Sequence, residues 1–183
     1  HHHAGPPSLD FGKGGDILYR WGNPANYRAG APEDRTLHQQ HDARWVQAGK
    51  PGAGNITIFN NGSNRPSGKY SSVDEITPPI NANGSYQIAS GRSFEPKQPH
   101  WSYTSPNTSD FYSSFISGAE RLSNGNTLIC DGPEGIFFEV TPDKQIVWQY
   151  NNPVTLPPAG PEGPNSVFRV TRYPKDYPGI MLK

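Results

Sequence analysis

The sequence has one cysteine and no long apolar run, and each shortage excludes a class of protein. Cys130 is the only cysteine among 183 residues, so neither an intrachain disulfide nor a zinc site built from thiolates can form. Because it lies in the apolar stretch NTLICDG, we predict a buried, inert thiol. No stretch has the roughly eighteen apolar residues of a membrane-spanning helix, and no signal-peptide pattern is present.

Excess charge and helical periodicity are also missing. Sixteen basic and sixteen acidic residues cancel, which predicts no basic surface for nucleic acid or an anionic membrane. No window keeps apolar residues at helical spacing without an intervening glycine or proline. Instead, β-branched and aromatic residues stand in short runs between turn residues, among 20 glycines and 20 prolines. We predict a single all-β domain over residues 1–183, rich in turns.

Internal repeats are the most informative feature of the chain. An aromatic residue, a second aromatic two positions later and a proline three positions after that occur in LYRWGNP, HWSYTSP and VWQYNNP. Side chains two apart on a strand share a face, and proline ends a strand. The three copies therefore predict aromatic stripes that pack between sheets, with a platform for a ligand as the alternative. Their residues are Tyr19, Trp21 and Pro24; Trp101, Tyr103 and Pro106; and Trp148, Tyr150 and Pro153.

A second recurring element lies upstream of the last two copies. GNITIFNNG matches GNTLICDG, and SVDEITPP matches FFEVTPD, which aligns Glu75 with Glu139. The recurrence of these glutamates favours a structural hydrogen bond over acid/base chemistry. One unit consists of four strands and about forty residues, the size of a propeller blade.

We therefore predict a partial β-propeller of four-stranded antiparallel blades, with about two full blades plus flanking strands. A closed propeller typically has about four to eight blades, so other subunits or further blades are expected to complete the ring. The loop inserted in the first blade is the expected partner-facing surface. The predicted parts are an outer strand of a preceding blade at 15–24, a blade at 37–106 with the inserted loop at 79–99, a compact blade at 113–153 and a closing strand at 165–173.

Several motifs also resemble a known family. GDILYRWGNP, QHDARWV, GAGNITIFNNG, YSSVDEI, ERLSNGNTLIC and FEVTPDKQIVWQY are similar to the C-terminal blades of bacterial arylsulfotransferase-like (aryl-sulfate sulfotransferase) β-propellers. The resemblance runs from Gly15 to about Gly179. It implies sulfuryl transfer from a phenolic sulfate to a phenol through a sulfated histidine in the axial funnel, without metal or other cofactor. It also implies a periplasmic or extracellular protein.

The resemblance points to particular residues. His41 of QHDA and Arg65 after FNNG are the catalytic candidates, since imidazole can act as nucleophile or base near neutral pH and guanidinium neutralises sulfate oxygens. Asp42, Arg44 and Asn61 are the candidates for substrate binding. The alternatives are a strand-end histidine bonded to a turn and a solvated arginine, and Arg44 is expected to pair with an acidic neighbour.

The second histidine that such an enzyme needs has no counterpart in the next repeat, which reads SSFISGAERL. His38 and His100 lie outside the matching motif positions. Two functions therefore stay open: sulfuryl transfer acting on a small aromatic sulfate or phenol, and a non-catalytic propeller that serves as an accessory or assembly subunit through protein–protein contacts.

Overall fold

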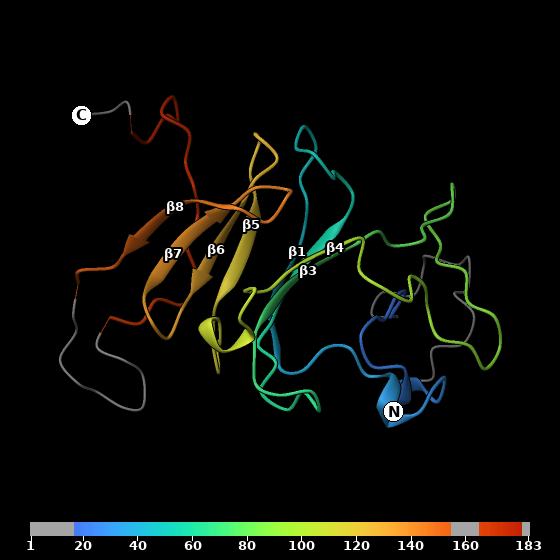
Figure 1. Ribbon diagram of the computed structural model, residues 1–183. Helices are drawn as coiled ribbons and strands as arrows, with labels where there is room; N and C mark the ends of the chain where they lie inside the picture. The colour runs from blue at the N-terminus through green and yellow to red at the C-terminus, as the bar shows by residue number, and fades with distance from the viewer. Residues whose placement is uncertain (1–16, 155–164, 181–183) are drawn as a thin grey trace.

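Two four-stranded antiparallel sheets make up the described fold, which confirms the predicted all-β blade architecture. The computed structural model describes residues 17–154 and 165–180. In each sheet the strands follow one another in chain order, and the two sheets lie side by side (Figure 1). The first sheet contains β1 (Gln40–Trp45), β2 (Ile56–Asn60), β3 (Ser72–Ile76) and β4 (Trp101–Tyr103); the second contains β5 (Gly118–Arg121), β6 (Thr127–Asp131), β7 (Ile136–Val140) and β8 (Ile146–Asn151).

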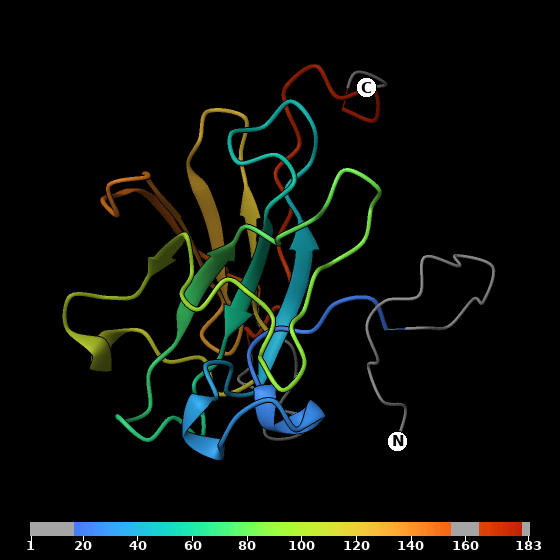
Figure 2. The same ribbon diagram turned by 90° about the vertical axis from the view of Figure 1, so that its right-hand side faces the viewer.

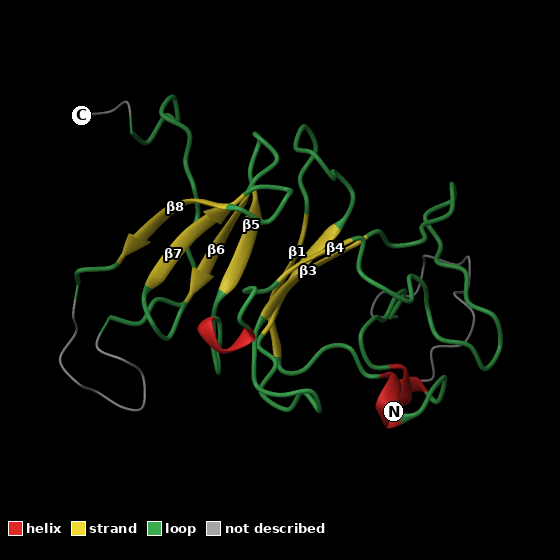
Figure 3. Ribbon diagram, viewed as in Figure 1, coloured by secondary structure: helices red, strands yellow, loops and turns green. Residues whose placement is uncertain are grey.

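Helical structure is limited to short turns at the margins of the sheets (Figure 3). Three 3₁₀ helices are described: η1 (Pro24–Tyr27), η2 (Pro32–Asp34) and η3 (Thr108–Asp110). Among the residues that the structure describes, no helix is long and apolar enough to cross a membrane.

The repeat seen in the sequence reappears in the strand register. Glu75 of β3 lies opposite Trp101 of β4, and Glu139 of β7 lies opposite Trp148 of β8. Two residues along, Tyr103 and Tyr150 occupy matching positions opposite Val73 and Phe137. The two sheets are therefore copies of one blade.

The hydrophobic core fills the space between the two blades. Phe111, from the connection between the blades, makes edge-to-face contacts with Phe59 at 5.7 Å and with Phe138 at 5.5 Å between ring centroids. Such aromatic pairs stabilise beyond the area they bury. The other members are Val73, Tyr103, Ala119, Ile129 and Val140. The aromatic stripe of the first blade is thus a packing surface.

The far face of the first blade is covered by the N-terminal segment and the inserted loop. Tyr19 and Trp21 pack there over Ile58 and Ile76. The Tyr19 hydroxyl donates to the Glu95 carbonyl at 2.7 Å, and the Trp21 indole donates to the Pro96 carbonyl at 2.6 Å. Figures 1 and 2 show this loop, in green, close to the blue N-terminal segment. These contacts anchor part of the loop to the chain itself.

Neither flanking strand is formed in the described residues. Residues 17–23 have no strand partner, and residues 15 and 16 of the expected outer strand lie outside the described part. Residues 165–173 also form no strand, although the Val167 amide donates to the Gly132 carbonyl at 2.9 Å and the Ser117 amide donates to the Phe168 carbonyl at 3.2 Å. The segment expected to close the sheet therefore runs beside the second blade without joining it.

Candidate functional site

His41 is held by Asn61 in one defined hydrogen-bonding state. The two side chains meet at 2.7 Å, from His41 Nδ1 to Asn61 Oδ1. The Asn61 amide nitrogen donates to the carbonyls of Ser113 at 2.8 Å and Ile116 at 3.1 Å, which fixes its oxygen as the acceptor for His41. In the neutral imidazole of His41, Nδ1 therefore carries the proton and Nε2 has the lone pair. Asn61 is fully buried, whereas His41 is half-buried.

Asp42 and Arg44 are brought together, and a bulge in β1 is the reason. The register shifts between His41 and Arg44, and Asp42 has a positive φ of 50°. A bulge of this kind redirects a side chain. Arg44 Nη2 lies 2.6 Å from each carboxylate oxygen of Asp42, and the Ala119 amide donates to Asp42 Oδ2 at 3.1 Å. Arg44 thus has the acidic partner that was expected for it, and Asp42 joins the first strands of the two blades.

Arg65 lies in the turn after β2. Its guanidinium lies 4.3 Å from the Tyr70 ring centroid, and Nη2 donates to Ser72 Oγ at 3.2 Å. Among the described residues, its buried Nε has no hydrogen-bond partner. Arg65 lines a cavity of about 470 Å³ together with Arg35, His38 and Tyr70.

His38 lies at a cavity although no sequence motif predicts a role for it. It lines the Arg65 cavity, whereas His41 does not. Its side chain is buried, and burial, followed by the charges of Arg65 and Arg35, lowers the pKa of its imidazole below the ordinary value. The family motif gave no signal for His38; its position three residues before His41, facing the turn that carries Arg65, appears only in the fold.

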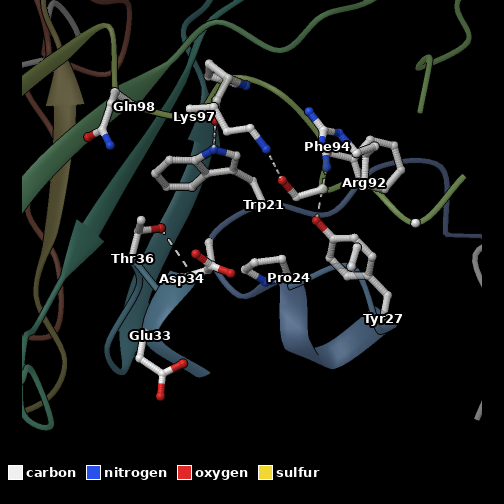
Figure 4. Close-up of a pocket in the computed structure, with 15 residues that line it drawn as sticks. Trp21, Pro24, Tyr27, Glu33, Asp34, Thr36, Arg92, Phe94, Lys97 and Gln98 are labelled. Carbon is white, nitrogen blue, oxygen red and sulfur yellow. Dashed lines mark hydrogen bonds between the residues drawn. The ribbon is translucent and has the colours of Figure 1, made fainter. Parts of the chain in front are cut away.

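A second cavity of about 550 Å³ adjoins the first (Figure 4). It opens between the N-terminal segment and the inserted loop, and the two cavities share Trp21, Glu33, Thr36 and Gln98. Tyr27 closes one side, where its hydroxyl accepts from the Phe94 amide at 3.1 Å. Charged side chains of both signs surround the opening: Glu33, Asp34, Arg92 and Lys97.

The recurring glutamates have structural partners, in line with their interpretation from the sequence. The Asn55 amide donates to Glu75 at 2.5 Å, and the Asn126 amide donates to Glu139 at 2.6 Å. Glu75 also forms a buried ion pair with Arg121. Within residues 17–154 and 165–180, no group of three or more histidine, cysteine, aspartate or glutamate side chains is arranged to hold a metal ion.

Two matching blades, an inter-blade core and a histidine held by a buried asparagine define a protein of the β-propeller class with a polar site at the blade junction. A family model described as Arylsulfotransferase (ASST) matches residues 29–155, more than half of the chain. The chain belongs to the arylsulfotransferase family. No curated protein and no solved structure matches it.

Proposed function

We propose that this chain contributes to sulfuryl transfer between phenolic compounds, with His41 as the base or sulfate ligand. The observation that carries the proposal is the hydrogen bond from His41 to Asn61, because in the neutral imidazole it puts the proton on Nδ1 and the lone pair on Nε2. A neutral imidazole whose second nitrogen is fixed by a neighbour is the usual form of a nucleophilic or basic histidine. Family membership supports the same chemistry.

Arg65 is the sulfate clamp in this proposal. Its guanidinium borders a cavity, its Nε has no partner among the described residues, and its forked donors can bind two oxygens of a tetrahedral sulfate. Asn61 was expected to contact substrate, but both ends of its amide are engaged within the protein, so we assign it to holding His41. Asp42 forms ion pairs with Arg44 and, at 3.7 Å, with Arg169, and we assign Asp42 and Arg44 to the joint between β1 and β5.

The test is turnover of p-nitrophenyl sulfate with a phenol as acceptor. We expect His41→Ala to abolish turnover and Arg65→Gln to raise KM for the sulfate donor. Asn61→Leu should lower kcat and shift the pH–rate profile, since the imidazole loses its fixed tautomer. His100→Ala is the matched control, because this histidine is exposed and outside the site. Equal activity of the His41→Ala variant and the unchanged protein would rule the proposal out.

One observation favours a second candidate, an accessory or assembly subunit. Every residue of β8 is exposed, including Trp148 and Tyr150, and a broad apolar surface of this kind marks a protein contact. A native mass above that of one chain, or a complex captured with its partner, would support this candidate. A location in the periplasm or outside the cell is the setting that we infer for both candidates from the family.

A further inference from the structure

The joint between the two blades contains a clasp made of an arginine, a glutamate and a tryptophan. Arg121, at the end of β5, forms an ion pair with Glu75 of the preceding blade. Its guanidinium also lies 5.1 Å from the ring of Trp101. Asn55 donates to the other oxygen of Glu75 at 2.5 Å. The first strand of one blade is thereby fixed on the third and fourth strands of the blade before it.

The same clasp occurs a second time, at the outer face of the second blade. Arg172 Nη1 lies 2.9 Å from Glu139 Oε2, and its guanidinium lies 5.8 Å from the Trp148 ring. Asn126 donates to the other oxygen of Glu139 at 2.6 Å. The contacts of Arg121 with the glutamate and the tryptophan both have counterparts at Arg172. Residues 165–173 therefore occupy, on the second blade, the place that β5 occupies on the first.

The two clasps differ in what covers them. The Arg121 side chain is 7% exposed, whereas that of Arg172 is 52% exposed. Tyr103 of the first blade is 3% exposed, and its counterpart Tyr150 is 45% exposed. β5 is a strand because β6 pairs with it; in the described part of the chain, residues 165–173 have no such partner. In the described part of the chain, the second clasp therefore has a segment in the place of a first strand and no strands in the places of the other three.

We propose that the outer face of the second blade is a docking surface for a further four-stranded blade, which takes residues 165–173 as its first strand. We name this the third-blade surface; it consists of Phe137, Trp148, Tyr150 and Arg172. The occupant is a β-meander of three strands that pairs with the backbone of residues 165–173. It lays an apolar face on the tryptophan and tyrosine, as β5, β6 and β7 do on Trp101 and Tyr103.

A second copy of this chain does not fit the same geometry. At the other end of the molecule, the far face of the first blade is already covered by Tyr19 and Trp21. In the first blade, Trp45 lies opposite Ile56; in the second blade, Arg121 lies opposite Thr127 at the equivalent position. The position in β1 that would supply the arginine of the clasp therefore holds a tryptophan. A copy therefore cannot repeat the joint seen between the two blades. This inference deepens the assembly candidate and is independent of sulfuryl transfer.

The experiment supplies the missing strands from the chain's own second blade. A second copy of residues 122–154 is inserted after Arg172 in the full chain. Arg172 is then followed by the same residues that follow Arg121. We expect amide hydrogen exchange in residues 165–173 to become as slow as in β5. Arg172→Ala should then lower the Tm by as much as Arg121→Ala does, although in the parent chain it lowers the Tm only slightly.

Two parent-chain measurements keep the proposal open to refutation if the insertion variant fails to fold. Trp148→Glu should leave the Tm of the parent nearly unchanged, whereas Trp101→Glu should lower it strongly; equal losses would overturn the proposal, because the surface would already be covered. If the parent chain forms a dimer, and Trp148→Glu dissociates this dimer but Trp45→Glu does not, a second copy of the chain is the occupant. Amide hydrogen exchange in residues 165–173 that stays as fast in a folded insertion variant as in the parent would also refute the proposal.

Discussion

Gly118 lies directly against the carboxylate of Asp42, at the point where β5 of the second blade passes the bulge of β1. A Cβ atom on residue 118 would overlap Oδ2 of Asp42. The next residue, Ala119, donates its amide to that oxygen at 3.1 Å. The absence of a side chain at 118 is thus what allows the aspartate to reach the neighbouring blade.

Gly118→Ala is expected to destabilise the fold by about 1–3 kcal/mol, because an inserted methyl group must displace a buried carboxylate. Urea denaturation gives the free energy of unfolding. The control is the double variant with Asp42→Ala, in which the overlapping group is gone. The alanine at 118 should cost markedly less in that background, and equal costs in the two backgrounds would show that the overlap with Asp42 is not the cause.

The blades and their register can be predicted from the sequence, because aligning the two repeats shows which residues occupy equivalent positions in the two sheets. Glu75 and Glu139 were aligned from the sequence alone, and each has an asparagine donor in the structure. The bulge at Asp42 could not be predicted, because adjacent strand residues ordinarily point to opposite faces. His38 was missed for a different reason, since no local pattern shows that the turn carrying Arg65 folds back over it.

His38 makes the stability of the protein depend on pH. Burial first, and then the charges of Arg65 and Arg35, lower the pKa of its imidazole in the folded state. As the pH falls through about 6.5, the unfolded chain takes up a proton that the folded chain resists, so the stability decreases. The urea midpoint should therefore be lower at pH 5.5 than at pH 7.5, and His38→Gln should reduce this difference.

The exposed His100 supplies the control for that prediction. His100→Gln should leave the pH dependence of the urea midpoint unchanged. Removal of a neighbouring charge gives a second check: in Arg65→Gln, the pKa of His38 measured by NMR titration should rise. A pKa that stays the same would mean that Arg65 does not act on the imidazole.

Cys130 should behave as an inert thiol. The side chain is fully buried, and burial, followed by the neighbouring charges of Asp131 and Asp42, raises its pKa to about 12. Since the thiolate is the reactive form, iodoacetamide at pH 8 should leave the native protein unmodified and alkylate it in urea. Intact mass spectrometry distinguishes the two. Rapid alkylation of the native protein would show that β6 opens readily, because burial disfavours the thiolate in the closed blade.

Glu75 and Glu139 offer a matched comparison of a buried and a half-exposed clasp. Glu75→Gln leaves Arg121 charged, buried and without its carboxylate, and the loss of one partner of a buried pair costs about 3–5 kcal/mol. Glu139→Gln faces an arginine that water still reaches, so the expected cost is about 1 kcal/mol or less. Both variants keep an amide oxygen that can accept from Asn55 or Asn126. The measured loss therefore reports the missing negative charge. The free energy of unfolding, measured at low and at high salt, should show a large and salt-insensitive loss for Glu75→Gln only. Equal losses for the two variants would mean that cover by a following blade does not determine the strength of the clasp.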